Sequence, residues 1–416
     1  MIDPSVPVVC AFRGGYADVS IARSLGRLGV PMYLVAQKGM PTPVWSSRYW
    51  AKRTRWDYSS PEEQSVAFLL DLGATLRATH GTRAILLATS DWVAIFIERN
   101  SHLLQKQFVF PQPVRPVIRT LLNKWEVHLL AKEHHIPTPN TAYPALLADI
   151  DEFLETSSFP IVMKPADPYL RDPTSRNMII NSRQELMDAV GRKADHASLN
   201  VVLQEYIPGE ADSVWMCNGY FAQNKEHTVT FTGKKLRQTS STGLASLAIC
   251  LPNETVATQT ARLMEGVGFR GCVGIGFRYD SRDGLYKLLD VNARVSGVFR
   301  LFAGTNEMDV VRVCYLDLTG QQVPETALQP GRKWMLEDDV SAALRAIRSG
   351  RLSVAEWIRS IRDVQELQWF AKDDPVPFLI WLRERVRGVW RRVSGVLRRL
   401  MAGFRGTVRW RRSPRC

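Results

Sequence analysis

The first ninety residues alternate short apolar runs with helical patterns, and this alternation constrains the fold more than any other feature of the sequence. An apolar run at 7–12 is followed by a helical pattern over 17–28 and a second apolar run at 30–36. Another helical pattern, over 62–76, leads into the run at 84–89. Such alternation is typical of a parallel sheet covered by helices. The sequence therefore predicts an open α/β domain at the N-terminus.

Polar residues stand where these predicted strands end, which is where open α/β sheets bind ligands. Ser90 and Asp91 follow the third strand directly. A dinucleotide site is not expected, because the segment 12–16 reads Phe-Arg-Gly-Gly-Tyr rather than GxGxxG. The second strand also ends in Ala36-Gln37, without the acidic residue that binds a ribose.

Prolines mark the end of this domain. Pro111, Pro113 and Pro116 favour a linker near 111–118, and a helix is predicted from about 120 to 134. A helical pattern follows from Trp334 onward. The strands expected in between are 161–164, 178–180, 201–206, 213–217, 228–233, 271–279 and 285–292. We divide the chain into an α/β domain (1–117), a second domain (118–325), a helical appendage (326–376) and a basic tail (377–416).

Composition excludes several classes of protein. With 416 residues, 45% hydrophobic and 23% charged, the chain is too apolar for a disordered protein. Its six cysteines are scattered without a CxxC pair, which favours a reducing compartment. Neither a secretory signal pattern nor an apolar run of 18 residues is present, so we expect a cytoplasmic protein that does not span a membrane.

Four segments carry a more specific signal, through their order along the chain. They read Leu-Asn-Lys-Trp at 122–125, Phe-Pro-Ile-Val-Met-Lys-Pro at 159–165, Val-Leu-Gln-Glu-Tyr-Ile-Pro-Gly at 202–209 and Lys-Leu-Leu-Asp-Val-Asn-Ala-Arg at 287–294. Together they resemble the ATP-grasp superfamily, in its bacterial carboxylate–amine ligase branch that includes D-aspartate ligase-like sequences. The resemblance implies an α/β (α+β) ATP-grasp fold with an N-terminal Rossmann-like pre-ATP-grasp domain and a helical, basic C-terminal extension.

The resemblance also implies an ATP site. A triphosphate needs cations from several chain segments, and Lys124 and Lys164 are the candidates. The adenine would meet a hinge at Glu205, Tyr206 and Ile207. The remaining candidates are Asp212 for the ribose, Lys235 or Arg237 closing over the phosphates, and Arg294 on the transferring phosphoryl group.

The metal site departs from the family pattern. Asp290 and Asn292 alternate on one predicted strand and face the same side, as Mg²⁺ bound to ATP phosphates requires. Gly276 stands where related sequences carry an acidic residue, and Asp280 or Asp283 is a possible substitute. The loop expected over the phosphates has no glycine, and its charge comes from Arg171 and Arg176.

This resemblance implies ATP and Mg²⁺ as cofactors and a small-molecule carboxylate and amine as substrates. The expected reaction is phosphorylation of the carboxylate to an acyl phosphate, amine attack, and release of ADP and phosphate. The missing acidic residue and the glycine-free loop keep an alternative open, a nucleotide-binding pseudo-ligase that acts as a membrane-associated scaffold. The sequence does not specify the oligomeric state.

The net charge of +13 is concentrated at the C-terminus. Residues 378–416 contain twelve arginines, no lysine and one acid, Glu384, so the tail carries +11. Over 379–405 apolar residues fall on one helical face and arginines opposite, which is typical of a helix at an anionic membrane surface. We therefore expect the tail to meet the inner face of the membrane. Docking on the protein's own core remains the alternative, and nucleic acid is not an expected partner.

Overall fold

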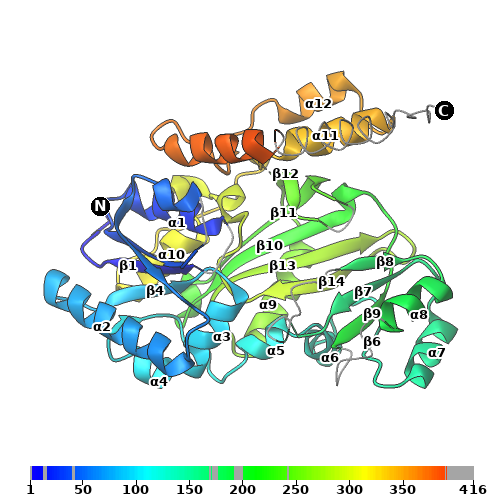
Figure 1. Ribbon diagram of the computed structural model, residues 1–416, viewed down its shortest axis with the longest axis horizontal. Coiled ribbons are helices and arrows are strands. Elements are labelled where there is room, and N and C mark those ends of the chain that lie inside the picture. Colours follow the sequence, from blue (N-terminus) through cyan, green and yellow to red (C-terminus); the bar gives the residue numbers. More distant parts are fainter. Residues whose placement is uncertain are drawn as a thin grey trace, which may run out of the picture.

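Three sheets make up the body of the molecule (Figure 1). The computed structural model describes residues 2–12, 16–39, 43–167, 170, 177–191, 200–240, 243–388 and 390. The N-terminal residues form a parallel sheet and residues 141–205 a small antiparallel sheet. A large sheet, antiparallel except at its last pair, lies between them and carries the middle of the fold.

The N-terminal sheet is doubly wound, with the order β3-β2-β1-β4-β5 and all strands parallel. Because the chain leaves β1 toward β2 on one side and later returns to β4 on the other, the carboxyl ends of β1 and β4 flank a crevice. Helices α1 (Ala17–Gly26) and α3 (Asp91–Arg99) begin at this crevice. The other elements are β1 (Val8–Phe12), β2 (Met32–Gln37), β3 (Trp50–Trp56), α2 (Glu62–His80), β4 (Ala84–Ala88), α4 (Ser101–Leu104) and β5 (Phe108–Val109).

The small sheet has the order β6-β9-β7-β8 and one covered face. Its buried residues, such as Ile161, Met163 and Leu203, pack against Ile150, Phe153 and Leu186 of the two helices beside it. Its elements are β6 (Thr141–Ala142), α7 (Leu147–Thr156), β7 (Ile161–Pro165), β8 (Met178–Ile180), α8 (Arg183–Gly191) and β9 (Val201–Glu205).

The large sheet has the order β14-β13-β10-β11-β12-β15-β16. Helices α9 (Glu254–Gly266) and α10 (Val310–Leu318) pack on it, and α10 also contacts α1 of the first domain. The register of β11 against β12 shifts at Arg237, a bulge that matters for the site. Its strands are β10 (Val214–Phe221), β11 (Val229–Gln238), β12 (Ala245–Cys250), β13 (Gly271–Asp280), β14 (Leu285–Asn292), β15 (Lys333–Met335) and β16 (Glu366–Leu367).

The single helix predicted over 120–134 is wrong, because the structure has two. Helix α5 (Ile118–Leu122) ends before Asn123, and α6 (Lys124–Glu133) begins after it. The Asn123 side chain accepts hydrogen bonds from the backbone N–H groups of residues 125 and 126, so it caps the new helix. This break makes Lys124 the first residue of α6.

The appendage predicted to be helical over 326–376 contains two helices, α11 (Asp339–Arg348) and α12 (Val354–Ile361), but it also contains two strands that the prediction lacked. Strand β15 precedes these helices and β16 follows them, and both strands extend the large sheet. A last helix runs over 376–388 and lies beside α11 along the upper edge in Figure 1. Among the described residues, no helix combines the length and apolarity needed to cross a bilayer.

A buried arginine fixes this C-terminal segment to the first domain. Arg23 of α1 is 2% exposed and forms an ion pair of 2.9 Å with Asp374. It also donates to the backbone carbonyls of Gln368, Trp369 and Asp374. Four hydrogen bonds therefore satisfy a charge that would otherwise be costly to bury, and they position the start of the last helix.

Candidate active site

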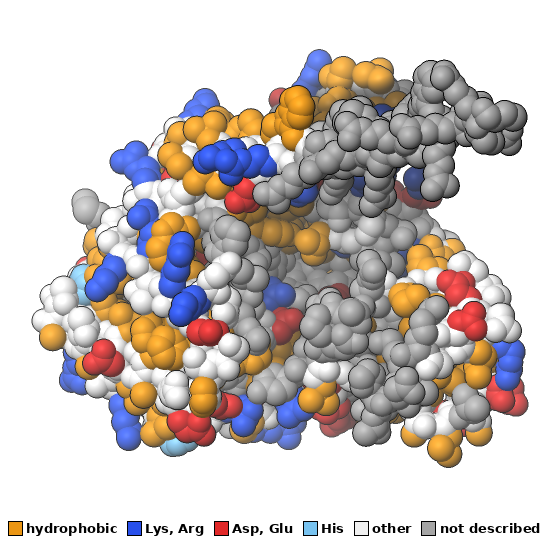
Figure 2. All heavy atoms as spheres, viewed as in Figure 1, with side chains coloured by type: hydrophobic (Ala, Val, Ile, Leu, Met, Phe, Trp, Pro, Cys, Tyr) orange, Lys and Arg blue, Asp and Glu red, His pale blue; other side chains and the backbone are white. Residues whose placement is uncertain are grey.

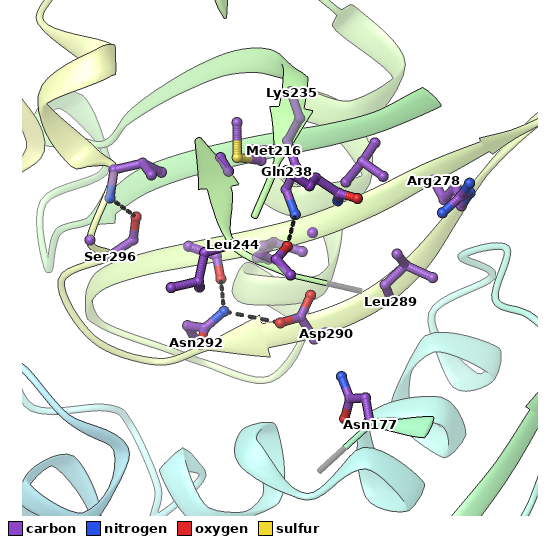
Figure 3. Close-up of a pocket in the computed structure, with 18 of the residues that line it drawn as sticks. Asn177, Met216, Lys235, Gln238, Leu244, Arg278, Leu289, Asp290, Asn292 and Ser296 are labelled. Carbon is purple, nitrogen blue, oxygen red and sulfur yellow. Dashed lines mark hydrogen bonds between the residues drawn. The ribbon is translucent and has the colours of Figure 1, made fainter. Parts of the chain in front are cut away.

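A cavity of about 740 Å³ lies where the three sheets come together. Strands β7 and β9 of the small sheet form one wall. Strands β10, β11, β13 and β14 form another (Figure 3). The starts of α1 and α3, at the crevice of the N-terminal sheet, close one end. The cavity thus collects side chains from segments nearly 300 residues apart.

Three lysines from three different elements line this cavity, and we call them the lysine cluster: Lys124, Lys164 and Lys235. Lys124 starts α6, where its backbone N–H donates to the carbonyl of Ala166 over 2.8 Å. The Lys164 ammonium donates to the Gln204 side chain over 2.5 Å, and that of Lys235 to the Gly243 carbonyl over 3.2 Å.

Asp290 is the carboxylate that these lysines face. Burial alone would raise the pKa of Asp290, yet the positive charges of the lysine cluster hold it below its ordinary value. Burial lowers the pKa of Lys164 to about 8, helped by the charge of Lys124, and it lowers the pKa of Lys235 as well. Positive charge is therefore concentrated here at a cost in solvation, as is expected of a site built for an anion.

The predicted hinge lies on the wall opposite β14. Glu205, Tyr206 and Ile207 all line the cavity, at the end of β9. The Glu205 carboxylate is held by Arg282 at 2.5 Å, and its backbone N–H donates to the carbonyl of Asn140. Because the Glu205 carboxylate is bound to Arg282, the segment 205–207 offers a ligand its backbone groups and the side chains next to Glu205.

The structure separates two candidates from this site. Asp212 is 62% exposed, lies 3.9 Å from Lys234 and is not among the described lining residues. Arg237 points elsewhere, because its guanidinium forms a two-pronged ion pair with the buried Asp339. Of the two basic residues that the sequence did not distinguish, Lys235 is the one that lines the cavity.

The metal candidates are adjacent. Asn292 donates to Asp290 over 3.2 Å, and both face the cavity from β14 (Figure 3). Mg²⁺ is usually held by one or two carboxylates together with phosphate oxygens. The carboxylate of Asp290 and the amide oxygen of Asn292, beside the lysine cluster, fit an ion shared with a triphosphate. Among the described residues, no group of three His, Cys, Asp or Glu side chains forms a complete metal cage.

Gly276 is explained by its neighbour across the ladder. It pairs with Asp290 in the β13–β14 register, and a Cβ on it would lie 2.4 Å from the Asp290 Oδ1. The Asp290 carboxylate therefore occupies the room of a side chain at 276. The two suggested substitutes are engaged elsewhere, because Lys287 forms ion pairs with both Asp280 and Asp283.

Arg294 marks the end of the cavity that meets the first domain. Its Nε lies 2.6 Å from an Asp91 carboxylate oxygen, and its NH2 donates to the Asn292 side chain over 3.2 Å. Tyr16 and Gly297 lie at the same end, in such close contact that a Cβ on Gly297 would lie 2.5 Å from the Tyr16 ring. The sequence interpretation assigned no site role to two lining residues, Tyr16 and Gln204, although Gln204 directly precedes the predicted hinge within the segment 202–209. Arg171 and Arg176 lie outside the described residues.

No family model matches the chain. It is 24% identical over 260 residues to the D-aspartate ligase of Enterococcus faecium (strain Aus0004), an alignment that covers 59% of this chain and 61% of that protein. The chain thus spans less than two thirds of the length of this curated relative.

Solved structures agree on the fold. The L-amino acid ligase of Bacillus licheniformis superposes with a TM-score of 0.57 at 15% identity, over 79% of each chain. The biotin carboxylase domain of the 2-oxoglutarate carboxylase of Hydrogenobacter thermophilus, solved with MgADP, ADP and bicarbonate, gives a TM-score of 0.58 at 13% identity. That match covers 78% of this chain and 73% of the other. The predicted ATP-grasp fold is confirmed.

Proposed function

We propose that the chain is an ATP-dependent ligase of the ATP-grasp superfamily that joins a carboxylate to an amine through an acyl phosphate. The observation that carries the proposal is the lysine cluster facing Asp290 inside one cavity, with the hinge on the opposite wall. In this proposal a triphosphate binds at the end that the lysine cluster lines, and Arg294 acts at the other end.

The predicted residues that line the cavity have separate roles in the proposed reaction. Backbone groups of the hinge, at 205–207, bind the adenine; no ribose role is given to Asp212, which lies outside the described lining of the cavity. The lysine cluster neutralises the phosphate oxygens. Mg²⁺, held by Asp290 and Asn292, withdraws charge from the triphosphate when it is bound. Arg294 stabilises the transferring phosphoryl group. In-line phosphoryl transfer to a carboxylate needs no protein nucleophile, so positioning and electrostatics suffice.

The names of the relatives suggest the substrates. One is a D-aspartate ligase and another an L-amino acid ligase. We therefore propose an amino acid as at least one of the two substrates. A pool of D-aspartate and the twenty L-amino acids is the first set to test, with release of ADP as the measurement.

Nucleotide binding gives the sharpest test. Calorimetric titration of the wild type with ADP and Mg²⁺ should give binding that Lys235→Met weakens by about 10- to 100-fold, since a charge-assisted hydrogen bond is lost. Lys225→Met is the matched control, because Lys225 lies on the preceding hairpin connection with its side chain 74% exposed. A wild type that binds no nucleotide, or an equal effect of both variants, refutes the assignment.

A nucleotide-binding scaffold without turnover is the second candidate, and the lone carboxylate Asp290 beside Gly276 favours it. Gly276→Glu separates the two candidates. In an active ligase the new side chain displaces Asp290, so amino-acid-dependent ADP release falls, and Mg²⁺-dependent ADP binding weakens without being lost. If the protein is a scaffold, the wild type binds ADP but forms no ADP from ATP in the presence of the whole amino-acid pool. Gly276→Glu then has no activity to remove.

The last helix supports a further proposal, that it binds an anionic membrane surface. Phe378 and Trp381 pack on the body, and an adjacent stripe of Leu379, Leu382 and Val386 is 41–56% exposed. Figure 2 shows hydrophobic and basic side chains interleaved along this upper edge. The helix therefore docks on the core of the protein through one face only. The rest of the helix predicted over 379–405 lies outside the described residues, apart from Trp390.

Vesicle flotation of the full chain tests this. Val386→Asp should reduce recovery on phosphatidylglycerol-containing vesicles, because it places a charge within the apolar stripe. Val114→Asp is the matched control, an exposed valine of the linker that is 71% exposed. Equal recovery of both variants and the wild type, or equal binding to neutral vesicles, contradicts the proposal.

A further inference from the structure

The ion pair between Arg294 and Asp91 joins two domains inside the cavity. Asp91 is the first residue of α3, directly after the end of β4, and Arg294 follows β14. Both side chains line the cavity, at 34% and 21% exposure, and their contact of 2.6 Å spans 203 residues of sequence. The guanidinium that the proposed reaction needs is therefore already holding a carboxylate.

This contact has the chemistry of a substrate complex. A guanidinium recognises carboxylates through paired N–H groups. The Arg294 group donates to Asn292 on one side and to Asp91 on the other, so Asp91 occupies the position beside the metal candidates that a reacting carboxylate must enter. A substrate carboxylate that reaches this guanidinium has to displace Asp91.

A second carboxyl group, that of Asp18, interacts with the same Arg294 guanidinium. Asp18, near Thr89 at the same crevice, is fully buried, and neither of its oxygens has a hydrogen-bond partner among the described residues. Burial raises the pKa of Asp18 to about 7. A displaced Asp91 would thus lose its cation in a crevice that also holds the Asp18 carboxyl group, at the edge of the sheet where parallel sheets bind ligands. An ammonium group restores the balance of charge.

We propose that Asp91 is a switching carboxylate: it occupies the acyl site on Arg294 in the empty protein and binds the ammonium of the amine substrate once the carboxylate substrate has displaced it. This inference rests on the proposed ligase function and names its amine substrate as a cationic, ammonium-type amine. Asp91 would then accept one proton from the ammonium. The freed nitrogen lone pair forms the C–N bond, the C–O bond to the phosphoryl group breaks, and phosphate leaves with that electron pair and the second proton.

Two effects in opposite directions are expected of Asp91→Asn. Removing the internal competitor lowers the concentration of carboxylate needed for half-saturation by several-fold. Removing the charge weakens binding of a cationic amine by about 10- to 100-fold, the usual effect of losing a hydrogen bond to a charged group. A purely structural role of Asp91 at the start of α3 would move both constants the same way or neither.

The assay uses the full chain with ATP, Mg²⁺ and the pool of D-aspartate and L-amino acids as the carboxylate source. Hydroxylamine, a neutral amine, traps the acyl phosphate as a hydroxamate, which is measured as its coloured complex with ferric iron, and glycinamide, a cationic amine, competes for the acyl phosphate. Asp91→Asn should lower the half-saturating pool concentration and raise the glycinamide concentration that halves hydroxamate formation. Asp91→Glu should keep the glycinamide effect near the wild-type value.

Asp57→Asn is the control, since Asp57 also follows a strand of the same sheet and bonds only locally with Ser59 and Gln37. It should match the wild type in both measurements. If the wild type forms hydroxamate but Asp91→Asn shifts neither constant, or shifts both upward, the switching role is refuted and the ligase function stands. If the wild type binds no nucleotide and forms no hydroxamate, the proposed function fails, and this inference fails with it.

Discussion

Nucleotide affinity should fall as the pH rises through the pKa of Lys164. In the empty cavity, burial holds the pKa of this lysine at about 8, so half of it is neutral at that pH. Phosphate binds the charged form and therefore draws a proton onto Lys164 as it binds. Affinity is then fully present below the pKa of the empty site and is lost above it.

The size of the effect follows from the fraction that is charged. With a pKa of about 8, that fraction falls from about three quarters at pH 7.5 to about one tenth at pH 9, roughly eightfold or about 1.2 kcal/mol of binding free energy. The phosphate groups of ADP are already ionised over this range, since their last pKa lies near about 6. Titration of the nucleotide therefore does not imitate the effect.

Calorimetry of ADP with Mg²⁺ between pH 7.5 and 9 measures this slope. Repeating it in buffers of different ionisation enthalpy reports the proton taken up. Lys164→Arg should flatten the profile, because a guanidinium stays charged throughout, whereas Lys235→Arg should keep most of it. A flat wild-type profile, an affinity that rises with pH, or a slope retained in Lys164→Arg would refute the role given to this lysine.

Two further predictions concern arginines whose roles the structure separates. Arg23→Met should lower the free energy of unfolding by about 3–5 kcal/mol, because Asp374 stays buried without its cationic partner. Arg27→Met breaks a half-exposed pair and should lower the free energy of unfolding by less than about 1 kcal/mol. Urea denaturation compares the two variants, and equal losses contradict the argument. Arg237→Met should also destabilise the fold, by leaving the buried Asp339 without its cation, yet leave ADP affinity unchanged in calorimetry. A loss of ADP affinity without a loss of stability would return Arg237 to the site.

How far the sequence predicts this fold depends on the length of each element. Apolar runs of five or more residues, such as 161–165 and 271–280, are long enough to show a strand pattern, and most were found. Strands β15 and β16 have three and two residues and are defined only by the partner they pair with, so no local pattern reveals them. Tertiary pairing decides such elements, and the segment 326–376 was consequently interpreted as helical.

The choice between Lys235 and Arg237 shows a different limit. Residues two apart on a regular strand face the same side, so alternation alone places both over the cavity. The bulge in β11 at Arg237 breaks this alternation, and Asp339, 102 residues further along, captures the guanidinium. Both causes lie outside any local pattern of the sequence.

Gly276 is a second position whose role depends on its partner strand. In the sequence Gly276 looks like a missing metal ligand, because a motif compares residues one position at a time along a single strand. In space the position is shared by two strands, and the Asp290 carboxylate of the neighbouring strand already fills the volume that a side chain at 276 would need. A second carboxylate there would bring two like charges into contact, and the lysine cluster already balances the one present. The glycine is therefore a condition for the observed position of Asp290, and Gly276→Ala alone should shift that carboxylate and weaken Mg²⁺-dependent nucleotide binding.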